Sequence, residues 1–123
     1  MSREGCTLIS PAGNFRIFLA TEPIDFRKGI DGLSAHIANS FDLDPYCGAI
    51  YVFRSQRADR LKLLVWDGTG TVMLVKRLNG GQFKWPKRQT EPVVLSKVQF
   101  EALFEGIDWT QVSARNTRKP VFI

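Results

Sequence analysis

The sequence predicts a compact α+β domain built on an antiparallel β-meander of about five strands, with one helix early and one helix late. Short runs of alternating apolar residues follow one another through brief glycine-containing connections, which favours antiparallel neighbours. Helical spacing of apolar residues occurs only before and after this series, so strands and helices do not alternate. A chain of 123 residues with 44% hydrophobic and 24% charged residues suits a single core. We expect residues 1–112 to form this domain and residues 113–123 to be a basic, flexible tail.

The first elements are a strand and a helix. Residues 14–21 alternate apolar side chains with others, as a strand does, after a Pro- and Gly-containing turn. Apolar residues then recur at steps of three and four, which predicts a helix whose buried stripe is Ile30, Leu33, Ile37 and Phe41. Asp25 is a candidate N-cap for this helix. The Asp44-Pro45 pair ends it.

The middle of the chain predicts the meander. Its main strands cover residues 49–54, 60–66 and 71–77, and a glycine-containing turn joins the last two. A short strand at 82–85, ended by Pro86, and a last strand at 93–95 complete the sheet. If the strand at 82–85 is exposed, it could pair with its copy across a two-fold axis and give a homodimer.

The late helix begins at Ser96. Ser96 and Gln99 have the spacing of a capping box, in which each residue's side chain binds the other's backbone N–H. Gly106 stands where a glycine commonly ends a helix. We therefore expect a helix of about two turns after the last strand.

Positive charge is concentrated between residues 54 and 88. This stretch contains nine Lys or Arg residues against two Asp residues, although the whole chain carries only +5. A localised positive surface favours a polyanion, and aromatic rings among the cations offer a face to an unstacked base, so nucleic acid is the expected partner. The candidate contacts are Arg54, Arg57, Arg60, Lys62, Lys76, Arg77, Lys84, Lys87 and Arg88, with Trp85 or Phe83 stacking on a base.

The alternation in residues 60–66 predicts how these charges are presented. Arg60 and Lys62 share one face with Trp66, and the opposite face carries Leu61 and Leu63. One face can be core, so the other would offer cations beside an indole ring. The alternative that stays open is an ordinary solvated sheet face with a buried Trp.

A second charged segment, residues 25–33, predicts contact with a protein. Its Arg-Lys pair lies between acidic residues and glycines, a composition that neither helix capping nor core packing requires. The candidate partner-binding residues are Asp25, Arg27, Lys28 and Asp31. One protein that bridges nucleic acid and a protein partner would use both surfaces.

No catalytic set can be assembled from the sequence, so we expect a protein that is not an enzyme. Two-metal nucleases need clustered carboxylates, but helix capping explains Asp25, pairing with a neighbouring Arg explains Asp59, and turn chemistry explains Asp67. The catalytic alternative that remains is Asp25 and Asp31 acting with the Arg-Lys pair between them. Single helix-start charges of this kind more often serve capping and solvation.

Other classes of site and location are also disfavoured. The two cysteines, with His36 as the single histidine, provide too few ligands for a zinc site. No glycine-rich loop is followed by the residues of a nucleotide site. We therefore expect no metal and no cofactor. No apolar run reaches the ~20 residues of a membrane span and no signal peptide is recognisable, which predicts a cytoplasmic protein without membrane contact.

Several segments together resemble the small Orf2-like (TnpB) accessory proteins of IS-66-type insertion sequences. The matching stretches lie in order between residues 8 and 110, and they include Asp25-Phe26-Arg27-Lys28-Gly29-Ile30-Asp31-Gly32-Leu33, Tyr51-Val52-Phe53-Arg54, Trp66-Asp67-Gly68, Phe83-Lys84-Trp85-Pro86 and Leu103-Phe104-Glu105-Gly106-Ile107-Asp108-Trp109. The resemblance implies a protein encoded beside the transposase of a mobile element and needed for its movement. The resemblance implies no defined biochemical role. Taken together with the basic stretch, it makes DNA at the element ends and the transposase the expected partners.

Overall fold

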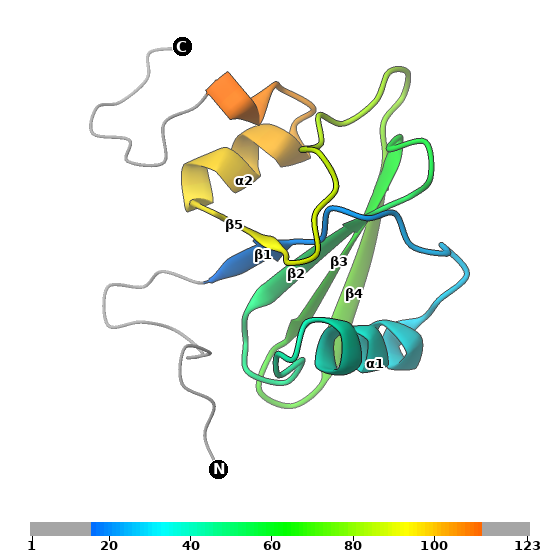
Figure 1. Ribbon diagram of the computed structural model, residues 1–123, viewed down its shortest axis with the longest axis vertical. Coiled ribbons are helices and arrows are strands. Elements are labelled where there is room, and N and C mark those ends of the chain that lie inside the picture. Colours follow the sequence, from blue (N-terminus) through cyan, green and yellow to red (C-terminus); the bar gives the residue numbers. More distant parts are fainter. Residues whose placement is uncertain (1–15, 112–123) are drawn as a thin grey trace.

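The computed structural model describes residues 16–111 and contains one five-stranded sheet with a helix against each face (Figure 1). The predicted tail at 113–123 lies outside the described residues. The elements in chain order are β1 (Ile17–Leu19), α1 (Ile30–Ser40), β2 (Ile50–Arg54), β3 (Arg60–Trp66), β4 (Thr71–Arg77), β5 (Val93–Leu95), α2 (Lys97–Phe104) and the short 3₁₀ helix η1 (Trp109–Gln111).

The strand order is β4-β3-β2-β1-β5, in a mixed and mostly antiparallel sheet. Strands β2, β3 and β4 form the predicted antiparallel meander, and β5 runs antiparallel to β1. β1 and β2 are parallel, which differs from the wholly antiparallel sheet that we expected. The cause is the long connection between them, because it carries α1 across one face of the sheet, as a parallel pair requires. The α+β class with an early and a late helix is confirmed.

Each face of the sheet has its own apolar core. Under α1, the helix residues Leu33 and Ile37 pack against Tyr51, Phe53 and Leu64 of the central strands. The opposite core has α2 and η1 above it and contains Leu19, Val52, Leu61, Leu63, Leu95, Leu103 and Trp109. The central strands β2 and β3 are therefore buried on both faces, and no sheet face is left for solvent in their middle portions.

The two helices start in different ways. α2 has the predicted capping box, because the Gln99 N–H donates to the Ser96 hydroxyl and the Ser96 N–H donates to the Gln99 side chain. α1 begins at Ile30 with Gly29 as its N-cap and no capping side chain, so the expected Asp25 cap is wrong. Asp25 instead lies in the preceding turn, where its carboxylate accepts a hydrogen bond from the Arg27 backbone N–H at 3.0 Å.

The predicted short strand at 82–85 is absent, and these residues belong to an irregular segment between β4 and β5. In Figure 1 this yellow-green segment runs from the end of β4 past α2. Phe83 is buried in the core under α2, and the Trp85 indole N–H donates to the carbonyl oxygen of Ala20 at 2.8 Å. These tertiary contacts replace strand pairing, so residues 82–85 do not form the exposed strand through which the sequence analysis allowed a homodimer.

Candidate nucleic-acid interface

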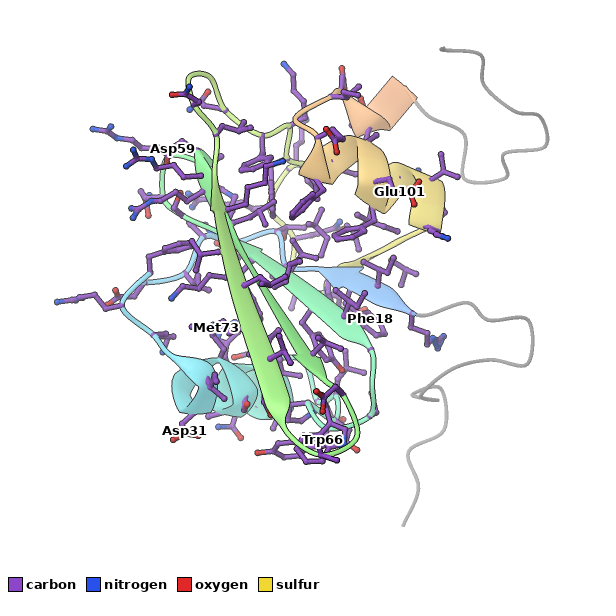
Figure 2. All side chains as sticks on the ribbon, turned by 180° about the vertical axis from the view of Figure 1, so that it is seen from behind. Phe18, Asp31, Asp59, Trp66, Met73 and Glu101 are labelled. Atoms are coloured by element: carbon purple, nitrogen blue, oxygen red, sulfur yellow. The ribbon has the colours of Figure 1, made fainter. Side chains whose placement is uncertain are left out.

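The basic residues predicted from the sequence gather mainly at one end of the sheet, where β2 ends, β3 begins and β4 ends. Arg54 is the last residue of β2, and Arg60 and Arg77 are paired in register across β3 and β4. Figure 2 shows nitrogen-tipped side chains beside Asp59, at the opposite end of β3 from Trp66. Antiparallel pairing therefore brings together cations that are far apart in the sequence.

The turn between β2 and β3 is held rigidly by its own side chains. The Ser55 hydroxyl donates to the Asp59 carboxylate at 3.1 Å and accepts the Arg60 N–H at 3.2 Å. Ala58, in the left-handed region with φ 59°, is buried and accepts the Phe83 N–H through its carbonyl oxygen at 2.7 Å. The exposed Arg57 thus projects from a fixed backbone, which lowers the entropy cost of placing it against a ligand.

The irregular segment after β4 continues the positive surface along the same end of the sheet. The Gln82 side chain donates to the Arg57 carbonyl oxygen at 2.7 Å, and the Gln89 N–H donates to the Thr21 hydroxyl at 2.8 Å. Between these two anchors, the segment carries exposed basic side chains. We name the exposed cations of this end the basic rim: Arg57, Arg60, Arg77, Lys84, Lys87 and Arg88.

Arg54 lies beside the basic rim and binds backbone carbonyl oxygens next to it. Its guanidinium donates to the Thr21 carbonyl oxygen at 3.3 Å and to the Gln56 carbonyl oxygen at 3.2 Å. Burial lowers the pKa of Arg54, and the nearby charge of Arg88 lowers it further. Arg88 lies 3.8 Å from the Glu22 carboxylate, so part of its charge is neutralised within the protein.

Lys62 and Lys76 are not part of the rim, because both are bound within the fold. Lys62 is only 5% exposed, and its ammonium donates to the carbonyl oxygens of Phe26 and Lys28 at 2.7 Å each. Burial lowers the pKa of Lys62, with the charge of Arg60 as the next cause. The Lys76 ammonium binds the carbonyl oxygen of Phe104 at the C-terminal end of α2, where a positive charge is favoured by the helix dipole.

The prediction that Arg60 and Lys62 share a solvated face with Trp66 is correct for Arg60 and wrong for Lys62. Arg60 is exposed, and its guanidinium lies over the Phe26 ring at 4.8 Å from the ring centre. Lys62 is covered by residues 26–28, which precede α1. Trp66 is half-buried and packs edge-on against Tyr46, at the end of β3 away from the rim.

The aromatic residues proposed to stack on a base are engaged in the fold. Phe83 is buried, and Trp85 is half-buried with its N–H bound to Ala20. Trp109 is buried, and its N–H donates to the Lys84 carbonyl oxygen at 2.7 Å. These bonds fix the backbone that carries Lys84, so the aromatic residues position the rim cations.

The predicted partner-binding segment lies directly beside the rim. Arg27 has a side chain that is 90% exposed and makes an ion pair with Asp25 at 2.8 Å. Hydrogen bonds from Arg27 hold the pKa of Asp25 well below its usual range, so this carboxylate stays charged. Asp31 is exposed in the first turn of α1, and the Lys28 side chain packs over Gly32.

Phe26 and Gln82 are two contributors that the sequence analysis did not single out as site residues. Phe26 lies between the cations of Arg60 and Lys62, with the Lys62 nitrogen 4.6 Å from its ring centre, and so joins segment 25–28 to β3. The sequence signal that could have identified Phe26 was its position within the Asp-Phe-Arg-Lys stretch. Nothing in the sequence near Gln82 indicated that its side chain would hold the Arg57 backbone.

The acidic residues proposed for metal or catalytic chemistry are dispersed. Asp59 binds Ser55, and Asp67 accepts N–H bonds from Thr69 and Gly70 within the β3–β4 turn, which lower its pKa. Within residues 16–111, no group of three His, Cys, Asp or Glu side chains is placed to hold a metal ion. None of the helices in the described part of the chain is long and apolar enough to span a membrane.

Comparison with known proteins places this chain in a family. The chain is 40% identical over 113 residues to the uncharacterized protein y4jC of Sinorhizobium fredii, covering 92% of this chain and 97% of that protein. It is 35% identical over 100 residues to the uncharacterized protein y4hO of the same organism, covering 80% and 87%. No solved structure matches the chain. The family model described as IS66 Orf2 like protein matches residues 15–114, and the chain therefore belongs to this family of transposition-associated accessory proteins.

Proposed function

We propose that this protein is a non-catalytic accessory factor of transposition that binds DNA at the element ends through its basic rim and assists the transposase. The observation that carries the proposal is the presence of six exposed Lys and Arg side chains at one end of a rigid sheet. DNA is a polyanion of regular charge spacing, and cations on a fixed scaffold match it at low entropic cost. Membership of the IS66 Orf2-like family supplies the transposition context.

The rim cations suit phosphate contacts. Arg57, Arg60 and Arg77 present guanidinium groups, which can bind phosphate oxygens through two parallel N–H bonds. Lys84 and Lys87 add compact positive charges along the irregular segment. Contacts of this kind position a protein on DNA without reading its sequence. Recognition of the terminal sequence would therefore need an arginine of the rim to reach the base edges in a groove.

The test is fluorescence anisotropy of the full chain with a duplex from the element's terminal repeat and with a scrambled duplex. Arg57→Glu combined with Lys84→Glu should weaken binding to both duplexes by ~10-fold or more, because two attractive contacts become repulsive. The matched control is Lys97→Glu, because Lys97 is exposed but lies away from the rim. It begins α2 just after Leu95, and Leu95 pairs with Ile17 at the end of β1 that is farther from the rim. Equal binding by the wild type, the Arg57→Glu/Lys84→Glu variant and the Lys97→Glu control, at unchanged thermal midpoints, would refute the DNA-binding proposal.

A second candidate function is docking on the transposase without nucleic-acid contact. It is favoured by residues 25–28, where Arg27, with a side chain 90% exposed, makes an ion pair with Asp25, which is 47% exposed. Ile30, just beyond this segment, is 37% exposed. Arg27→Ala with Lys28→Ala should then abolish capture by the immobilised transposase while leaving the thermal midpoint unchanged. Capture at the wild-type level would remove this segment as the docking surface.

A further inference from the structure

We propose that two copies of this chain pair edge to edge through β4, antiparallel about a two-fold axis at Leu74, to form one continuous sheet. Among residues 16–111, β4 is the outermost strand of the sheet and has β3 as its single neighbour (Figure 1). This inference does not depend on DNA binding. It rests on the exposure of β4, on the direction of its backbone groups and on its fit to itself.

β4 carries several exposed apolar side chains, which is unusual for an edge strand. Val72 is 38% exposed, Leu74 is 53% exposed and Val75 is 54% exposed. Soluble proteins normally protect such edges with proline, charges or very short strands, because an open edge invites pairing with another strand. β4 has seven residues, contains no proline and carries its charges only at its end, in Lys76 and Arg77. The opposite edge strand, β5, has only three residues.

The register between β3 and β4 determines which backbone groups of β4 are unused by the sheet. Asp67 and Gly70 are joined by a hydrogen bond at 2.9 Å, and so are Leu78 and Asp59 at the other end of the hairpin. In an antiparallel pair, hydrogen-bonded positions alternate with positions whose N–H and C=O point away from the neighbour. The backbone groups of four β4 residues therefore point away from β3: Thr71, Met73, Val75 and Arg77.

One symmetric register would use all of these outward groups. With Leu74 opposite Leu74 of the second copy, Thr71 pairs with Arg77, and Met73 pairs with Val75. Each of these pairs has outward N–H and C=O groups on both strands, so the whole of β4 takes part. The two Leu74 side chains then meet on the two-fold axis, Val75 lies opposite Met73, and Val72 lies opposite Lys76 of the second copy.

The charges of β4 are compatible with this self-pairing. The Lys76 ammonium is already bound to the Phe104 carbonyl oxygen and lies over the Phe104 ring, so it is directed toward its own α2. The two Arg77 residues are six residues apart along the strands, about 20 Å, which exceeds the distance over which exposed charges repel in physiological salt. Each Arg77 instead lies near the start of β4 in the second copy. The turn before that start contains the ionised, negatively charged Asp67.

The first test is sedimentation equilibrium of the full chain over a range of concentrations. The expected mass is twice the chain mass of 13.9 kDa. Leu74→Lys should shift the protein to the monomer mass, because two like charges would meet on the axis. Val94→Lys on edge strand β5, where Val94 is 59% exposed, is the matched control and should leave the dimer intact. A monomer at all concentrations, or a dimer insensitive to Leu74→Lys, would overturn the proposal.

The second test fixes the register by oxidative cross-linking. Leu74 would face its copy at a non-hydrogen-bonded position, where Cα atoms are ~4.5 Å apart, within the range that a disulfide spans. Leu74→Cys should therefore cross-link into covalent dimers far more than the unaltered chain does. Val72→Cys presents a cysteine on the same face but about 13 Å from its copy, so it should stay near that baseline. Equal cross-linking of the two variants would contradict the symmetric register.

Discussion

His36, the single histidine of the chain, is a partly buried packing residue of α1. Its ring packs edge-on against Phe41, with ring centres 5.2 Å apart, and lies 6.0 Å from Phe53 in the same core. Burial lowers the pKa of His36 below its ordinary value of 6.5, and the charge of Lys28 adds to this effect. The neutral ring is therefore the form that the fold favours.

This lowered pKa predicts how stability depends on pH. Below pH 6.5 the unfolded chain takes up a proton at His36 while the folded chain resists it, so the free energy of unfolding falls as the pH falls. Above pH 6.5 both states are neutral and the contribution is constant. Urea unfolding at pH 7.5 and 5.5 should show this loss in the wild type and a smaller loss in His36→Gln. The same loss in both proteins would contradict the assigned environment.

Individual residues also show why the candidate site could be predicted only in part. The excess of Arg and Lys between residues 54 and 88 was visible in composition, and the exposed rim retains six of the nine cations. Lys62 and Lys76 could not be distinguished from these cations, because their partners are carbonyl oxygens 34 and 28 residues away in the sequence. The local charge and the alternation of apolar residues do not indicate that a lysine will be buried against backbone that is distant in the sequence.

At the scale of elements, α2 depends on its N-terminal cap. The Ser96 hydroxyl accepts the Gln99 N–H at 3.1 Å, and the Gln99 side chain accepts the Ser96 N–H at 2.9 Å. The helix has only eight residues, too few to be stable without its cap and its packing.

Loss of this cap should destabilise the whole domain, because α2 covers one of the two cores. We expect Ser96→Ala to lower the free energy of unfolding by about 1 kcal/mol. Denaturant titration followed by circular dichroism measures this change, with Ser96→Thr as the variant that keeps a capping hydroxyl. A Ser96→Ala protein as stable as the Ser96→Thr protein would show that the cap contributes nothing.

The elements that could be predicted are those whose signals are local. The capping box, the hairpin turn at 67–70 and the alternation of β2, β3 and β4 all depend on residues a few positions apart. The parallel pairing of β1 with β2 depends on a crossover through α1, and the irregular path of 82–85 depends on Phe83 and Trp85 finding sites near Ala58 and Ala20. Interactions over such separations are decided by the whole fold.

At the scale of the whole molecule, α1 and α2 cover the two sheet faces, which leaves the ends of the sheet and its two edges, β4 and the three-residue β5, as its accessible parts. The rim occupies one end, and Phe26 attaches residues 25–28 to it through Arg60 and Lys62. The two surfaces that the sequence placed in separate segments are thus neighbours. A DNA contact and a transposase contact at this end would be close enough to influence each other.

The measurement that tests DNA binding by the rim most directly is the salt dependence of affinity for the terminal-repeat duplex. Each phosphate contact contributes ~0.9 to the slope of log affinity against log salt concentration. Arg57→Ala with Lys84→Ala should therefore reduce the slope by about 1.8, and Lys97→Ala should leave it unchanged. An identical slope for the wild type and the rim variant would mean that these cations do not contact phosphate, and would contradict the account.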